Sequence, residues 1–182
     1  MSGTLAKELL VDETTALTWH ELHRMMSGRI PHMKAKMMDL EEHRGPFKTQ
    51  DFLPRHINAC FVLLTATLSG RPQRHWGILV RNSAGVDFFD SLALKKHEIS
   101  HIVTNGKPFV EWMNREKIKK NTRKLQSHSK KVRTCGLWCI VRAAKWKMPT
   151  SRFVTWFLSV RNEKHDDLVA KLCWFGLLSH DK

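Results

Sequence analysis

The chain has 182 residues, of which 42% are apolar, and its 31 Lys and Arg against 17 Asp and Glu give a formal net charge of +14. The apolar content argues against a disordered chain, and the length suits one packed core, so we expect a single domain over residues 1–182. The longest apolar run, residues 59–66, is too short to cross a bilayer, so we expect no membrane partner. Residues 1–10 lack the layout of a signal peptide, which predicts an intracellular protein with reduced cysteines.

The positive charge predicts association with polyanions at low salt, because cationic side chains displace the counterions of a phosphate backbone. Charge alone indicates no reading of base sequence. The alternative is a solvated basic surface without a selected partner.

The N-terminal part begins with a predicted helix over residues 12–26, where apolar side chains recur at helical spacing and Thr14 or Thr15 is available as the cap. A proline separates this helix from a second segment, residues 33–43, which is first basic and then acidic. Gly and Pro residues mark a loop over residues 45–54.

The middle of the chain carries the strand signals. Residues 60–66 are apolar and partly β-branched, which is typical of a buried strand or a buried helix. Two apolar runs, residues 76–80 and 86–89, flank the turn residues 82–85, which predicts a β-hairpin.

The remaining segments read as helices. Residues 108–120 predict a basic amphipathic helix, residues 135–146 a buried helix, and residues 153–178 a mostly helical region with a break near Asn162. The order of helices, then strands, then helices predicts an α+β fold.

Cys135 is the first residue that could carry chemistry, because it stands at the predicted start of an apolar helix. The positive end of a helix dipole favours the thiolate, which is the nucleophilic form of cysteine. Gly136 would let a substrate carbonyl approach the backbone closely. The alternative role for Cys135 is that of a small buried apolar residue.

His75 and Asp90 could complete a catalytic triad with Cys135. His75 begins an apolar strand and could act as the base, and Asp90 ends the next strand and could orient the imidazole. Asp87 is a rival carboxylate, but alternation along a strand places Asp87 and Asp90 on opposite faces, so only one of them can face His75. The alternative for His75 is a polar side chain that only makes structural hydrogen bonds. The alternative for Asp90 is a carboxylate that only caps the end of its strand.

Gln126 is the candidate for the oxyanion hole. Its amide NH₂ could donate to the developing oxyanion together with the backbone N–H of Cys135.

Taken in order, these residues resemble the adenain family, the maturation proteases of adenoviruses and of related DNA viruses such as adomaviruses. The chain also resembles, more distantly, the SUMO-deconjugating proteases of the same clan. The resemblance covers about residues 45–145 in blocks, namely Gly45-Pro46-Phe47, residues 59–62, Arg74-His75-Trp76, residues 86–92, Leu125-Gln126 and residues 134–139.

The resemblance implies an adenain-like cysteine protease fold, with a small central sheet flanked by helices. It implies His75 as base, Asp90 as its orienting acid, Cys135 as nucleophile and Gln126 as oxyanion donor. It also implies a protein or peptide substrate among viral precursor proteins, action in the host nucleus and the virion, no cofactor, and stimulation by DNA and by a peptide activator.

Three features depart from the family pattern. Asp90 stands where adenovirus enzymes carry Glu, whereas the deconjugating branch carries Asp. The gap between Gln126 and Cys135 is longer than in the family. Residues 116–125 contain no Cys, although adenains use a Cys upstream of the Gln to bind their peptide covalently.

Two alternative functions remain open from the sequence. One is deconjugation of a ubiquitin-like protein by the same triad. Another is a non-catalytic nucleic-acid-binding protein, since residues 107–133 hold ten Lys or Arg against two Glu. A zinc site at Cys135, Cys139 and His128 would be short of a fourth ligand, so we expect no metal.

In either enzymatic case we expect non-specific DNA binding by the basic stretch. The cationic residues that we assign to it are Lys117, Lys119, Lys120, Arg123, Lys124, Lys130, Lys131 and Arg133.

Overall fold

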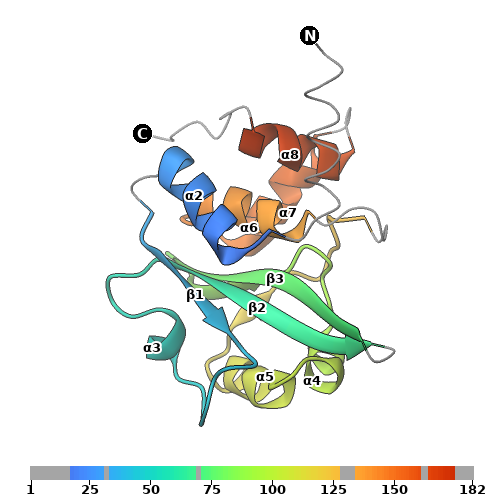
Figure 1. Ribbon diagram of the computed structural model, residues 1–182. Coiled ribbons are helices and arrows are strands. Elements are labelled where there is room, and N and C mark those ends of the chain that lie inside the picture. The colour runs from blue at the N-terminus through green and yellow to red at the C-terminus, as the bar shows by residue number, and fades with distance from the viewer. Residues whose placement is uncertain (1–16, 31–32, 69–70, 128–133, 161–163, 175–182) are drawn as a thin grey trace.

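The computed structural model describes residues 17–30, 33–68, 71–127, 134–160 and 164–174. In this part of the chain a five-stranded mixed sheet is flanked by helices on both faces (Figure 1), which confirms the predicted α+β class. The strand order is β1-β2-β3-β4-β5, with bounds Ala35–Asp39, Ala59–Leu68, Arg71–Asn82, Gly85–Phe89 and Lys119–Lys120. The inner pairs are antiparallel, and the two edge pairs, β1 with β2 and β4 with β5, are parallel.

The predicted hairpin is β3 and β4. Ser83 and Ala84 form its turn, the Ala84 backbone N–H donates to the Asn82 side-chain oxygen at 2.8 Å, and Gly85 has a φ of 116°, a conformation that favours glycine. Residues 60–66, predicted as a strand or a helix, lie within strand β2.

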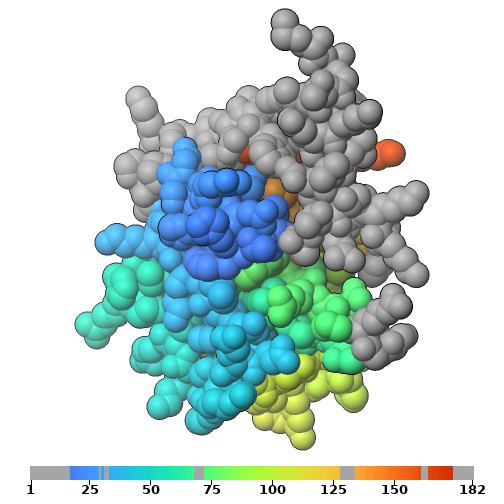
Figure 2. Space-filling view, viewed as in Figure 1, coloured from blue at the N-terminus to red at the C-terminus, as the bar shows by residue number. Residues whose placement is uncertain are grey.

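Helices cover the sheet in two layers (Figure 1). Helices α2 (Trp19–Arg29), α6 (Cys135–Ala144), α7 (Thr150–Leu158) and α8 (His165–Trp174) lie on one side, and α3 (Thr49–Phe52), α4 (Lys96–Ile102) and α5 (Gly106–Arg115) lie on the other. Figure 2, viewed from the same side, shows that side chains fill the space between α2 and the strands below it.

Alternation along the central strands explains why both layers bury apolar surface. Phe61, Trp76 and Ile78 pack with the α6 side, whereas Val62 and Leu79 pack with the aromatic side chains of α5. Both faces of β2 and β3 are therefore core, which fixes the register of the strands that carry the candidate site.

Several element boundaries differ from the sequence predictions. Helix α2 begins at Trp19, and its N-cap is Thr18, which forms a capping box with Glu21. The earlier cap candidates, Thr14 and Thr15, lie outside the described residues. The segment 33–43 contains strand β1, which is only five residues long and pairs with a strand more than twenty residues away.

The later helices also differ in length. Helix α5 ends at Arg115, because residues 119–120 pair with β4 as strand β5 instead of extending the helix. Helix α6 ends at Ala144, two residues before its predicted end. The predicted break near Asn162 lies outside the described residues, on either side of which α7 ends at Leu158 and α8 begins at His165.

Candidate active site

Cys135 is the first residue of α6, so its thiol lies at the N-terminal end of the helix dipole, as predicted. The side chain of the N-cap residue, Thr134, does not cap the helix but donates to Asp166 of α8. Asp166 also accepts from the Trp138 indole at 3.0 Å and from the Ser127 backbone N–H at 2.7 Å. Asp166 thus fixes the start of α6, a role that only the tertiary fold reveals.

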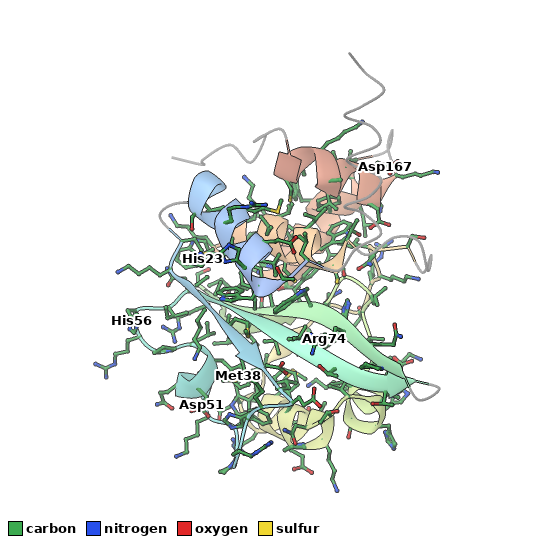
Figure 3. The ribbon with its side chains drawn as sticks, in the orientation of Figure 1. His23, Met38, Asp51, His56, Arg74 and Asp167 are labelled. Carbon is green, nitrogen blue, oxygen red and sulfur yellow. The ribbon has the colours of Figure 1, made fainter. Side chains whose placement is uncertain are left out.

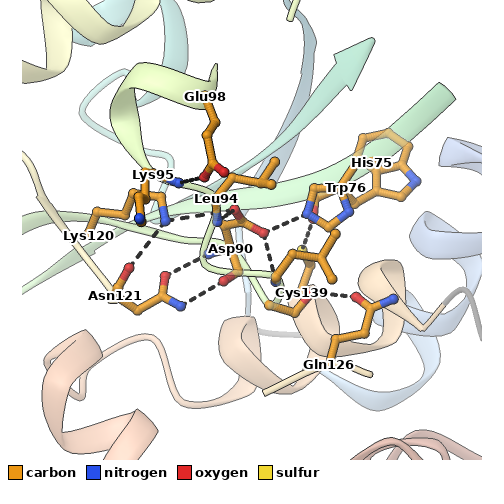
Figure 4. A network of polar contacts seen from close by, with 12 residues as sticks. His75, Trp76, Asp90, Leu94, Lys95, Glu98, Lys120, Asn121, Gln126 and Cys139 are labelled. Carbon is orange, nitrogen blue, oxygen red and sulfur yellow. Dashed lines mark hydrogen bonds and ion pairs between the residues drawn. The ribbon is translucent and has the colours of Figure 1, made fainter. Parts of the chain in front are cut away.

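His75 and Asp90 meet at the ends of neighbouring strands. The Nε2 atom of His75, on β3, lies 2.6 Å from Oδ1 of Asp90, the first residue after β4 (Figure 4). The Cys135 side chain lies close enough to His75 for each group to shift the pKa of the other. The structure therefore brings the three residues together in the order acid, histidine, cysteine, at the junction of the sheet and α6.

Asp90 is completely buried, and four residues besides His75 hold it in place (Figure 4). Its carboxylate accepts from the backbone N–H groups of Leu92 at 2.9 Å and Leu94 at 2.7 Å, and the Lys120 ammonium lies 3.7 Å from Oδ2. The Asn121 side chain bonds both backbone groups of Asp90, at 2.9 and 2.7 Å. The sequence analysis did not identify Asn121 and placed Lys120 on the surface.

Electrostatics favour a charged histidine. Burial of His75 lowers its pKa, but the adjacent Asp90 carboxylate and the hydrogen bonds to Asp90 and Cys135 outweigh burial and raise the pKa to about 10. The pKa of Asp90 is lowered, because the charge and hydrogen bond of His75, with the Lys120 charge, outweigh its burial. At neutral pH the pair is an imidazolium and a carboxylate.

The surroundings of Cys135 lower the pKa of its thiol, which favours the thiolate more than in a free cysteine. Burial raises its pKa, but the hydrogen bond and charge of His75 and the backbone N–H groups of Trp76 and Gly136 outweigh burial and lower it. The contrast with the other cysteines is large, because burial raises the pKa of Cys60 to about 12 and that of Cys139 well above its usual value. Cys135 is therefore the thiol that its surroundings activate.

Asp87, the rival carboxylate, faces away from His75. Its Oδ2 accepts from the Asn82 side chain and from the Thr150 backbone N–H, each at 2.8 Å, on the side of the sheet that α7 covers. The prediction that only one of the two acids can face His75 is thus confirmed, and that acid is Asp90.

Gln126 is buried beside the residue that follows Asp90. Its side-chain oxygen accepts from the Ser91 hydroxyl at 2.6 Å, and its backbone N–H donates to the Ser91 carbonyl at 3.0 Å. In Figure 4 the dashed line to Gln126 ends on its amide oxygen, and the amide nitrogen is at the other end of the group. Ser91 thus links Gln126 to the residue that follows Asp90 in the chain.

Trp76 and Gly136 have packing roles around the site. The Trp76 indole donates to the Leu17 carbonyl at 2.8 Å, and the Cys139 thiol donates to the Trp76 carbonyl at 3.5 Å. A Cβ added at Gly136 would come within 3.0 Å of the Leu22 side chain, so a glycine here lets α2 pack against the start of α6. This contact explains Gly136 without an approaching substrate.

The cationic residues assigned to DNA binding in residues 117–124 are exposed at the surface, with the exception of Lys120. Lys117, Lys119, Arg123 and Lys124 are exposed. Unlike these four residues, Lys120 does not present its ammonium to a DNA backbone at the surface. Its side chain is only 7% exposed and lies against Asp90. Its assignment to the DNA-contacting surface is therefore corrected. Lys130, Lys131 and Arg133 lie outside the described residues.

The chain was compared with known proteins, and its described residues were searched for metal sites and membrane-spanning helices. No family model, curated protein or solved structure matches the chain. In the described ranges there is no group of three or more His, Cys, Asp or Glu placed to hold a metal ion, and no helix long and apolar enough to cross a membrane. His128, from the zinc alternative, is outside those ranges.

Proposed function

We propose that the chain is a cysteine endopeptidase of the adenain type, with His75, Asp90 and Cys135 as its catalytic triad and with an adenain-like fold. The observation that carries the proposal is the 2.6 Å contact between His75 and Asp90, with the Cys135 thiol at a helix N-terminus and near enough to the same imidazole to have its pKa lowered by it. The role of a small buried apolar residue would account for Cys135 itself, but it would not account for a histidine and a buried carboxylate paired beside it.

The mechanism follows from these positions. The Cys135 thiolate attacks the scissile carbonyl carbon, and the resulting oxyanion accepts hydrogen bonds from the Cys135 backbone N–H and the Gln126 amide. The His75 imidazolium then gives its proton to the leaving amine as the thioester forms. A water molecule, deprotonated by His75, hydrolyses the thioester and restores the thiolate, while Asp90 keeps the imidazole oriented throughout.

The resemblance extends the proposal to substrate and setting. Viral precursor proteins would be the substrates, cleaved during virion maturation in the host nucleus and the virion, with DNA and a peptide as possible activators. Deconjugation of a ubiquitin-like protein is the second candidate, and the observation that favours it is that the orienting acid is Asp90 instead of Glu.

Selective alkylation tests the proposed nucleophile without any substrate. At mildly acidic pH we expect iodoacetamide to modify Cys135 faster than the other cysteines, because its thiolate persists below the ordinary thiol pKa of about 8.5. His75→Gln should slow this reaction, since the imidazolium stabilises the thiolate. Mass spectrometry of peptides from the modified protein gives the rate at each cysteine.

The matched control for alkylation is His56→Gln, at an exposed histidine in the loop after α3 (Figure 3). This substitution should leave the Cys135 rate unchanged. Faster labelling of Cys60, Cys139 or Cys173 than of Cys135, or equal effects of the two histidine substitutions, would reject the proposed nucleophile.

DNA binding is proposed to use the exposed part of the basic stretch. Neutralising about four phosphates should give a log–log slope of affinity against salt near −3 to −4 on duplex DNA, without sequence preference. Charge reversal of the exposed set should flatten the slope, whereas reversal of an equal number of exposed cations elsewhere should not. The exposed set is Lys117, Lys119, Arg123 and Lys124, and the control set is Arg24, Lys34, Lys48 and Arg55.

Fluorescence anisotropy in a salt titration with two unrelated duplexes measures this binding. A preference for one duplex, an affinity independent of salt, or equal losses from the two reversed sets would each contradict binding by this stretch.

A further inference from the structure

A cavity of about 850 Å³ lies beside the candidate active site, next to strand β5 and the N-termini of α4 and α7. Its size falls in the range of small-molecule sites, which is about 300–1,000 Å³. Neither the triad nor the proposed cleavage chemistry uses it, since His75, Asp90 and Cys135 are not among its lining residues.

The lining of this cavity is strongly cationic on one side. Five of its side chains are basic, namely Lys95, Lys96, Lys119, Lys120 and Arg123. The acidic lining residue, Asp87, is already bonded to Asn82 and to the Thr150 backbone N–H and lies near the Arg142 guanidinium. The cavity therefore presents a net positive surface to a ligand.

The rest of the lining is apolar or belongs to a helix start. Leu94, Ile118 and Val154 supply apolar wall, and Thr150 and Ser151 are the first residues of the nine-residue helix α7. The N-terminus of a helix attracts anions through its dipole, but the Asp87 carboxylate already accepts from the Thr150 backbone N–H, so the lysine and arginine side chains supply most of the attraction for a further anion. Apolar wall next to clustered cations suits a ligand that has both an anionic end and an apolar or aromatic body.

We propose that this cavity binds a small organic molecule bearing phosphate groups. The phosphates would lie against Lys119, Arg123 and the N-terminus of α7, and the body against Leu94, Ile118 and Val154. Binding does not depend on peptidase activity, so this site and the proposed peptidase stand or fall separately.

Occupancy of the cavity would act on the candidate triad through two shared residues. Lys120 lines the cavity and lies 3.7 Å from Asp90, and Asn121 lines it while bonding the Asp90 backbone. A phosphate that draws the Lys120 ammonium towards itself leaves more of the Asp90 charge to act on His75. Ligand binding is therefore expected to raise the pKa of the His75 imidazole further.

Isothermal titration calorimetry with ADP, pyrophosphate and adenosine tests the site on the full chain. ADP should bind more tightly than pyrophosphate, which lacks the apolar body, and more tightly than adenosine, which lacks the phosphates. Lys119→Gln with Arg123→Gln should weaken ADP binding about tenfold or more, because two charge-assisted hydrogen bonds are lost. Circular dichroism checks that the variants remain folded.

Lys117→Gln with Lys124→Gln is the matched control, because both residues are exposed cations of the same stretch that do not line the cavity. It should change ADP affinity by less than about twofold, since screened surface charges contribute little. Equal losses in the two double variants, equal affinities for adenosine and ADP or for pyrophosphate and ADP, or binding of a DNA duplex without binding of ADP would each overturn the site.

Discussion

Cys135→Ala is expected to lower kcat for peptide-bond cleavage by about 10⁴-fold or more, because it removes the only atom that forms the covalent intermediate. The protein should remain folded, because the change deletes one sulfur atom at the start of α6 and leaves the helix and its Asp166 anchor in place. Substrate binding should be nearly unchanged, so the loss should appear in kcat and not in KM.

The measurement compares two substrate classes with purified wild-type and variant protein. A library of unstructured peptides reports endopeptidase activity, and fusions to ubiquitin-like proteins report deconjugation. Cys139→Ala is the matched control, because Cys139 is a buried thiol one turn along the same helix whose pKa is raised. Turnover by Cys135→Ala near the wild-type rate would remove Cys135 as nucleophile, and cleavage of the fusions alone would favour the deconjugating enzyme.

Asp90→Asn is expected to lower kcat by about 10²- to 10⁴-fold, because the imidazole loses the charge that stabilises its protonated form and the acceptor that fixes its orientation. Asp87→Asn should have little effect on kcat, since Asp87 faces α7 and its bonded oxygen can be replaced by the amide oxygen of Asn. Steady-state kinetics of the two variants give the comparison directly.

The pH profile distinguishes a positioning role from a loss of fold. The proposed mechanism needs the Cys135 thiolate with the His75 imidazolium, so activity should fall on the alkaline side as His75 loses its proton near pH 10. Asp90 raises the pKa of His75, so Asp90→Asn should move this alkaline limb to lower pH, whereas Asp87→Asn should leave it in place. Equal losses of kcat, or an unmoved alkaline limb in Asp90→Asn, would mean that Asp90 does not orient His75.

The sequence predicted those parts of the site that depend on local patterns. The turn residues predicted the β3–β4 hairpin, and alternation along β4 separated Asp87 from Asp90. Apolar periodicity predicted a helix that begins at Cys135. Each of these signals comes from residues close together in the chain.

The residues that the sequence analysis missed act through long-range contacts. Lys120 was read as part of a basic helix face, but strand β5 pairs with β4 and carries its ammonium to Asp90. Asn121 and Asp166 have no local signal, because their partners lie 31 and 32 residues away in the chain. The short parallel edge strands β1 and β5 were not predicted for the same reason, since parallel pairing joins segments that are distant in the chain.

The hairpin that holds His75 and Asp90 has a consequence for how activity arises during folding. These two residues are 15 positions apart and share one local element, whereas Cys135 reaches them only when α6 packs on the sheet. Local hairpins close quickly and long-range contacts form later. The thiol is therefore expected to have no imidazolium beside it until the chain has reached its native topology, so the proposed nucleophile should be activated only in the folded protein. The rate at which Cys135 is alkylated during refolding would then report when α6 packs against the sheet.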